Sequence, residues 1–373
     1  MADLVDALVC MEPNGPYQLK KVRLGDLRDD EIIVQMRATG VCHADLLCST
    51  GDLPVPLPLC GGHEGAGVVE RVGSAVHHVE VGDHVLLSYK ICGECIACKR
   101  NSGPYCTKFP AENFRCSRPD GTTSLTLENG QKIASHFFGQ SSFSQRAIVS
   151  GQVALKIDKD LPLDTLCSLG CGIQTGAGTV LNVLKPKLGA NIVIFGVGAV
   201  GMAAVMAANL TPCAKIIAVD IFDSKLELAH KLGATHMINS IGTNTLAEIM
   251  KLTDGFGVDC AIDATGRLDV IRTMFDCAAP GAIVATVGSP GAGKKLEMEP
   301  HAWIHKAVSY VGVSEGSAIP ATFIPLLIEF WRHGRFPLEQ LVTTYPYTEF
   351  GKAKEDIEHG KCIKAVLLWP GSN

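Results

Sequence analysis

The stretch NIVIFGVGAVGMAAVMAANLTPCAKIIAVD, residues 191–220, decides the fold of this chain. An apolar strand is followed by Gly196, Gly198 and Gly201, then by an alanine-rich helix and a second strand that ends in Asp220. Glycines in this G-x-G-x-x-G spacing permit a tight turn, and a pyrophosphate can then approach the helix N-terminus closely. The carboxylate that ends the second strand can accept hydrogen bonds from the adenosine ribose. The stretch therefore predicts a dinucleotide-binding β-α-β unit.

The carboxylate at position 220 also discriminates between the two common dinucleotides. Its negative charge repels the 2′-phosphate of NADP, so the sequence favours NAD. Lys225 either touches the same ribose or is a solvated helix residue. Apolar runs in GVDCAIDATG (257–266) and GAIVATVGSPG (281–291) continue the alternation of strand and helix as far as Val313. This alternation predicts an α/β domain built on a parallel sheet.

The segments on either side of this domain have a different pattern. Residues 1–38 alternate short apolar runs with turns, which is typical of a β-rich domain. After Gly316 a helix, an extended run, a short helix and a final strand follow, and we expect the chain to return there to the first domain. A length of 373 residues makes two domains the natural expectation. We predict a catalytic domain of residues 1–170 and 316–373, and a dinucleotide-binding domain of residues 171–315.

Three residues from distant stretches carry metal-binding chemistry. Cys42 and His63 lie in GVCHADLLCSTGDLPVPLPLCGGHEGAG (40–67), and Cys171 lies in SLGCGIQTGAG (168–178), at the start of a predicted helix. Two thiolates and an imidazole suit zinc, and three protein ligands leave a fourth position open for water or substrate, as in catalytic sites. The alternative is that the three are unrelated core residues, and the dinucleotide motif weighs against it.

Four further cysteines lie close together in CGECIACKRNSGPYC. Their spacing is C-x2-C-x2-C-x7-C, and four thiolates close a tetrahedron without an open position, so we predict a structural zinc lobe over residues 92–106. An iron–sulfur cluster is the alternative, and the hydride-transfer features of the chain favour zinc. The predicted ligands are Cys92, Cys95, Cys98 and Cys106. The other nine of the fifteen cysteines lie mostly in apolar runs and are expected to be small core residues.

The composition excludes several classes of function. The chain is 47% hydrophobic and 19% charged, as soluble α/β proteins are. A net charge of −5 argues against nucleic acid or an anionic membrane as the main partner. No run of 18 apolar residues predicts a membrane span, and the first residues lack the positive charge and apolar block of a signal peptide. We therefore expect a cytoplasmic protein.

These motifs together resemble the zinc-containing medium-chain alcohol dehydrogenases, and the resemblance extends over essentially the whole chain. It is carried by GHEGAGVVERVG (62–73), the four-cysteine lobe, GCGIQTGAG (170–178) and GVGAVG (196–201). Among subgroups, VPLPLCGGHEGAGVVERVGSAV (55–76) and the stretch around Cys171 are most similar to aryl (benzyl) alcohol dehydrogenases. The resemblance implies a Rossmann domain, a β-rich GroES-like catalytic domain, two zinc ions per subunit, NAD and a homodimer.

The resemblance also implies roles for individual residues. Cys42, His63 and Cys171 would bind the catalytic zinc, and Glu64 would be an occasional extra ligand. Asp45 would hydrogen-bond His63, fixing the imidazole and raising its basicity.

Contacts with the cofactor are implied at both ends of the dinucleotide. Thr175 and Val200 would flank the nicotinamide, with Val287 nearby. His43 and Lys364 would contact the pyrophosphate as cations. The turn and the ribose side would be contacted by Gly196, Val197, Gly198, Ala199, Gly201, Asp220 and Lys225.

The sequence departs from the family pattern in its proton path. Ala44 stands where these enzymes usually carry a serine or threonine hydroxyl that starts the proton relay, and Leu47 stands where a histidine often ends it. Aryl members also commonly lack that histidine, so the alanine is the unusual feature. Water at the zinc, or His43 through a water chain, are the expected substitutes.

The predicted reaction is the interconversion of a primary alcohol, aromatic or allylic, and its aldehyde by hydride transfer with NAD(H). One alternative is a conjugated-alkene reductase of the same fold. A second is a glutathione-dependent formaldehyde dehydrogenase, against which Pro110 argues because that group carries an arginine at the matching place. A third is a non-catalytic binding protein on this scaffold.

Overall fold

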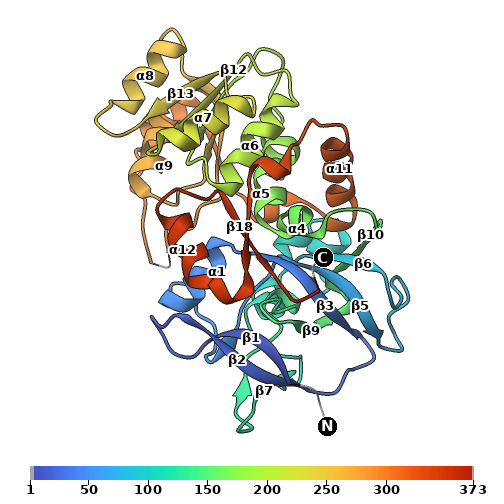
Figure 1. The fold of residues 1–373 in the computed structure, drawn as a ribbon. Coiled ribbons are helices and arrows are strands. Elements are labelled where there is room, and N and C mark those ends of the chain that lie inside the picture. Colours follow the sequence, from blue (N-terminus) through green and yellow to red (C-terminus); the bar gives the residue numbers. More distant parts are fainter. Residues whose placement is uncertain (1–3, 292, 372–373) are drawn as a thin grey trace. The chain divides into compact units, whose positions relative to one another are not determined.

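The computed structural model describes residues 4–291 and 293–371, and this part of the chain divides into two compact units (Figure 1). The first unit consists of the described residues of segments 1–171, 319–325 and 338–373. The second consists of those of segments 172–318 and 326–337. Residues 326–337, which the sequence assigned to the first domain, group with the second unit because they hold most of the helix α11 (Pro320–Arg332) and the turn after it.

The second unit contains a six-stranded sheet in the order β13-β12-β11-β14-β15-β16. All of its neighbouring strands are parallel, which confirms the predicted α/β class. The strands are β11 (Asn191–Phe195), β12 (Lys215–Asp220), β13 (His236–Asn239), β14 (Val258–Asp263), β15 (Ala278–Thr286) and β16 (Ser309–Gly312). The helices of this unit are α5 (Gly172–Gly178), a π-helix (Thr179–Leu184), α6 (Ala199–Asn209), α7 (Asp223–Lys231), α8 (Thr245–Leu252), α9 (Leu268–Asp276) and α10 (Pro300–Lys306).

The glycine-rich turn of this unit has a steric explanation. Gly196 ends β11 with φ +83°, a left-handed conformation that glycine adopts without strain. A Cβ on Gly201 would lie 1.9 Å from the carbonyl oxygen of Gly196, so only glycine lets α6 pack this close to the strand. The alanines of α6 favour a helix and are small enough to be buried against the sheet.

The first unit contains two mainly antiparallel sheets. One has the order β4-β1-β2-β7-β8, and the other has the order β10-β6-β5-β3-β18-β17, with β9 also paired to β3. The strands are β1 (Leu4–Cys10), β2 (Tyr17–Leu24), β3 (Glu31–Gly40), β4 (Leu59–Cys60), β5 (Gly65–Val72), β6 (His84–Leu87), β7 (Leu125–Leu127), β8 (Lys132–Ile133), β9 (Arg146–Ser150), β10 (Ala154–Ile157), β17 (Val342–Pro346) and β18 (Lys364–Leu368). The helices of this unit are α1 (His43–Thr50), α2 (Ile96–Lys99), α3 (Phe109–Asn113), α4 (Leu163–Leu166) and α12 (Phe350–Glu358).

The C-terminal part of the chain completes the larger sheet. In Figure 1 the late strand β18 lies beside the early strand β3, and residues 366–368 pair with residues 38–40. One buried cluster holds Val9 from the five-stranded sheet together with Val34 and Leu367 from the larger sheet, so both sheets share a core. Among the described residues, no helix has both the length and the apolar character that a membrane crossing requires.

Candidate functional site

The first unit brings together four residues that the sequence predicted as metal ligands. One ligand atom each from Cys42, His63, Glu64 and Cys171 lies within 4.8 Å of every other. Cys42 caps the N-terminus of α1, while His63 and Glu64 directly precede β5. Cys171 lies between a 3₁₀ helix (Cys167–Gly170) and α5, where its backbone breaks the helical run. We call these four residues the metal cluster.

The predicted hydrogen bond between Asp45 and His63 is present. Both side chains are fully buried, and Asp45 Oδ1 lies 3.0 Å from His63 Nδ1. The same carboxylate accepts hydrogen bonds from the backbone N–H groups of Gly62 and Cys42, each at 3.0 Å, so its own position is fixed. Nδ1 is therefore occupied, and Nε2 is the imidazole nitrogen left for the cluster.

The donor set of the metal cluster fits a zinc ion. His63 Nε2 is buried and has no hydrogen-bonding partner among the described residues. A buried polar atom without a partner is costly, and a metal ion would satisfy it. The hydrogen bond with Cys171, together with the positive charges near it, holds the pKa of Cys42 well below its ordinary value despite burial. A depressed thiol pKa favours the thiolate that binds zinc.

Lys364 has a different place from the one predicted. Its side chain is buried, its ammonium pairs with Glu64, and it donates a hydrogen bond to the carbonyl of Val41 at 3.1 Å. Burial alone would lower the pKa of Lys364, but the Glu64 carboxylate outweighs burial and raises it. A buried ammonium needs such a counter-ion, so here it faces Glu64 and not a pyrophosphate. His43, the other predicted pyrophosphate contact, is exposed at the first position of α1.

The four cysteines around α2 form the second candidate metal site. The distance between Sγ atoms is 3.4 Å for Cys92 and Cys106, and 3.5 Å for Cys95 and Cys98. One sulfur from each of the four lies within 4.8 Å of the others, and all four are free thiols. Four converging sulfurs and no oxygen or nitrogen ligand fit a closed tetrahedral zinc site.

The second unit contains a pocket of about 680 Å³ at the glycine-rich turn. Of the predicted cofactor contacts, Gly196, Gly198, Asp220 and Lys225 line it. Asp220 Oδ2 accepts a hydrogen bond of 2.8 Å from the backbone N–H of Val197, so the end of β12 is tied to the turn. The ammonium of Lys225 lies 4.8 Å from the centre of the neighbouring Phe222 ring. The turn and the acid thus form one wall of a cavity large enough for a nucleotide.

The other predicted cofactor contacts lie elsewhere in the second unit. Thr175 belongs to α5, and its carbonyl accepts a hydrogen bond from the Thr179 hydroxyl. Val287 directly follows β15, and its N–H donates to the carbonyl of Asp263. Val197, Ala199, Val200 and Gly201 belong to the turn and the first turn of α6 but are not among the residues that line the pocket.

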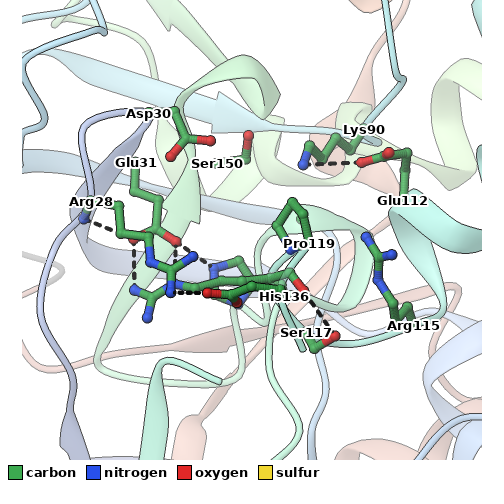
Figure 2. Close-up of a pocket in the computed structure, with 13 residues that line it drawn as sticks. Arg28, Asp30, Glu31, Lys90, Glu112, Arg115, Ser117, Pro119, His136 and Ser150 are labelled. Carbon is green, nitrogen blue, oxygen red and sulfur yellow. Dashed lines mark hydrogen bonds and ion pairs between the residues drawn. The ribbon is translucent and has the colours of Figure 1, made fainter. Parts of the chain in front are cut away.

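Sequence reasoning missed a second buried group of charges in the first unit, which we call the Glu31 cluster. Glu31, at the start of β3, accepts hydrogen bonds of 2.7 Å from Nε and Nη2 of Arg118, and His136 Nε2 lies 3.1 Å from it (Figure 2). These residues border a cavity of about 170 Å³ in which Lys90 also pairs with Glu112. The partners are far apart in the sequence and share no motif, so no local pattern pointed to them.

Comparisons with known proteins agree with this geometry. Residues 28–159 match the alcohol dehydrogenase GroES-like domain, and residues 199–331 match the zinc-binding dehydrogenase domain. The chain is 36% identical to a geraniol dehydrogenase from Castellaniella defragrans over 97% of both chains. It is also 32% identical to alcohol dehydrogenase 1 from Pisum sativum, over 97% of this chain and 96% of that protein.

Solved structures show the same likeness. A zinc-binding-domain alcohol dehydrogenase protein from Burkholderia ambifaria matches with a TM-score of 0.95 and 41% identity, covering 99% of this chain and 100% of that one. A benzyl alcohol dehydrogenase from Acinetobacter calcoaceticus matches with a TM-score of 0.94 and 37% identity, covering 98% of this chain and 99% of that one. Because sequence and structure agree over nearly the whole length, this chain belongs to the zinc-containing alcohol dehydrogenase family of oxidoreductases.

Proposed function

We propose that this enzyme interconverts a primary aromatic or allylic alcohol and its aldehyde, R-CH₂OH + NAD⁺ ⇌ R-CHO + NADH + H⁺. The observation that carries the proposal is the metal cluster, where an imidazole nitrogen without a partner lies beside two thiols. The substrate class is supported by two similar proteins, one named for geraniol, which is an allylic alcohol, and one named for benzyl alcohol.

In this proposal Cys42, His63 and Cys171 hold a catalytic zinc. When bound, the zinc lowers the pKa of an alcohol and polarises an aldehyde carbonyl. Asp45 holds the imidazole so that Nε2 faces the cluster, which the 3.0 Å contact with Nδ1 supports. Glu64 is the occasional extra ligand, and its pairing with Lys364 keeps its charge balanced inside the protein.

The proposed proton path avoids a side-chain hydroxyl. Ala44 lies in the first turn of α1 and has none, and Leu47 cannot carry a proton at the next turn. We infer that the alcohol proton leaves through water, with the exposed imidazole of His43 as the nearest titratable acceptor on that helix. Histidine suits this task because its ordinary pKa is close to neutral.

The two units have separate roles in this proposal. The first is the catalytic domain, with a structural zinc held by the thiols of Cys92, Cys95, Cys98 and Cys106. The second binds NAD, which supplies the hydride chemistry while the protein supplies position and charge. The proposed contacts are His43, Thr175, Gly196, Val197, Gly198, Ala199, Val200, Gly201, Asp220, Lys225 and Val287.

We also propose a cytoplasmic homodimer. β16 is an edge strand of the parallel sheet, and Tyr310 on it is 38% exposed. An edge strand with an exposed aromatic residue is a natural place for a second copy to pair. The fifteen free cysteines fit a reducing compartment.

The reaction is tested by steady-state rates over matched aromatic, allylic and aliphatic alcohol–aldehyde pairs, each with NAD and with NADP. We expect the highest kcat/KM for an aromatic or allylic pair with NAD. Product analysis with an unsaturated aldehyde separates the alternatives, because a conjugated-alkene reductase would yield the saturated aldehyde. That product, or a clear preference for aliphatic alcohols, would contradict the proposal.

The cofactor assignment is tested by Asp220→Ala. Removing the carboxylate deletes its predicted hydrogen bonds to the ribose and its repulsion of a 2′-phosphate, so we expect KM for NAD to rise about tenfold and NADP to be used better. Asp223→Ala, three residues on, is the control and should leave the ratio of NAD to NADP efficiency unchanged. An unchanged ratio in Asp220→Ala would remove this residue from the ribose site.

A further inference from the structure

Gln140 is a fully buried amide beside the metal cluster that no motif had singled out. Its Nε2 donates to the carbonyl of His63 at 2.8 Å and to the carbonyl of Ser88 at 3.0 Å. Its Oε1 accepts from the N–H of Gly65 at 3.1 Å. Both amide hydrogens are therefore used, and they bridge two backbone segments. Since a buried amide is costly without partners, this bonding fixes where the side chain and both segments lie.

The second of these segments leads to the other side of the metal cluster. Ser88 follows β6, is 1% exposed, and donates from Oγ to the carbonyl of Gly170 at 2.7 Å. Gly170 directly precedes Cys171, and a Cβ on it would lie 2.2 Å from the carbonyl oxygen of Leu87. The loop that carries Cys171 is thus pressed against the end of β6 and bonded to it.

The segment that supplies Gln140 also packs on the imidazole. The ring of His63 stacks on Phe138, with centroids 4.5 Å apart and an angle of 22° between the planes, and meets Phe137 edge-on. Phe138 has φ +52° and Ser141 has φ +52°, in the left-handed region that such residues rarely adopt. Backbone held in this region indicates that its surroundings impose the conformation, as is common at functional sites.

We propose that Gln140 and Ser88 are positioning residues that set the spacing between His63 and Cys171, and so the affinity of the metal cluster for zinc. The proposal rests on the proposed function, in which these two residues are zinc ligands. Asp45 orients the imidazole ring, whereas Gln140 and Ser88 brace the two backbone segments that carry the ligands against each other. Metal sites need ligand positions within a few tenths of an ångström, and the residues behind the ligands supply them.

The test measures zinc release from the purified holoenzyme. We expect Gln140→Leu to release the catalytic zinc to a chelator about 10- to 100-fold faster than the wild type, as outer-shell changes do, while the zinc of the four-cysteine lobe is retained. Ser88→Ala is the milder variant and should release it several-fold faster. With cobalt in place of zinc, both variants should shift the visible d–d bands, which report the ligand geometry.

Ser144→Ala is the matched control, because Ser144 is also a fully buried serine whose hydroxyl donates to a backbone carbonyl, that of Arg146 at 2.8 Å. It should lower thermal stability by an amount similar to Ser88→Ala without changing zinc release or the cobalt spectrum. Wild-type release and spectra in both Ser88→Ala and Gln140→Leu would overturn the positioning role, and so would equal acceleration in Ser144→Ala.

Cys42→Ser in the same assay separates this proposal from the proposed function. We expect it to be isolated with one zinc per chain fewer than the wild type. If it keeps the full zinc content, the metal cluster does not bind zinc, and both proposals fall. If it loses one zinc while Ser88→Ala and Gln140→Leu behave as wild type, the zinc site stands and the positioning role alone falls.

Discussion

The first unit buries two groups of charged and titratable side chains, and they differ in how their bonding capacity is used. In the Glu31 cluster both carboxylate oxygens of Glu31 accept from the guanidinium of Arg118, and His136 completes the set (Figure 2). In the metal cluster His63 Nε2 has no hydrogen-bonding partner among the described residues and lies beside two thiols. Burial alone therefore does not mark a functional site, but burial with an unmet bond does.

The two clusters also differ in what removing a member should do. The Glu31 cluster joins β3 to the excursion after the cysteine lobe, so its loss should weaken the fold and spare the chemistry. The metal cluster collects ligands for a reaction, so its loss should abolish turnover and largely spare the fold. The predictions below test this contrast, beginning with the largest effect.

Cys42→Ser should lower turnover by roughly a thousandfold or more, because a metal-bound thiolate is replaced by a poorer ligand and several kcal/mol of charge stabilisation are lost. Steady-state kinetics with benzyl alcohol and NAD measure this, and circular dichroism verifies the fold. Cys116→Ser changes a buried thiol that bonds to the carbonyl of Phe114 and should keep activity. Near-normal turnover in Cys42→Ser would erase the distinction between the clusters.

Glu31→Gln should destabilise the first unit by about 3–5 kcal/mol, because it leaves the buried Arg118 without its counter-charge. Chemical unfolding measures the change, and kcat should stay at the wild-type value. Asp120→Asn offers a matched comparison, since Asp120 pairs with Arg28 at the surface, where such a pair contributes at most about 1 kcal/mol. Equal losses in the two variants would mean that burial does not strengthen the Glu31 cluster.

The Glu31 cluster should also respond to acid. Burial alone would raise the pKa of Glu31, but hydrogen bonds from His136 and Arg118 lower it from 4.5 to about 2. The folded pKa lies below the unfolded one, so the stabilisation is complete above about pH 5 and is lost as the pH falls toward 2. Wild-type stability should therefore fall more steeply than that of Glu31→Gln between about pH 5 and pH 2.5. Parallel curves would contradict the assignment.

The smallest expected effect concerns the hydroxyl that the metal cluster lacks. Ala44→Ser should speed alcohol oxidation by up to about tenfold if proton removal limits the rate, because a positioned hydroxyl can pass the proton on. Ala44→Gly changes the size of the side chain without adding a hydroxyl and is the control. A gain in both variants would point to space and not to proton transfer, and no gain in either would show that another group already does this task.

The two clusters also show how far sequence reasoning reached. The glycine-rich turn with Asp220, the hydrogen bond of Asp45 and the parallel sheet were predictable, because each leaves a local spacing or a family motif in the sequence. The contacts of Gln140 and the pairing of Glu64 with Lys364 were not, because their partners lie on strands that only the fold brings together. The sequence gave Lys364 a solvent-facing task, and only its 2% exposure shows its partner to be internal.

The position of β18 between β3 and β17 has a consequence for biosynthesis. A ribosome delivers β3, Cys42 and His63 long before it delivers Lys364, the cation that neutralises Glu64 inside the protein. The larger sheet of the first unit therefore stays incomplete while the whole nascent second unit emerges and folds as a domain of its own. We expect the metal cluster to mature only after residues 364–368 have left the ribosome, so that zinc capture is among the last steps in making this enzyme.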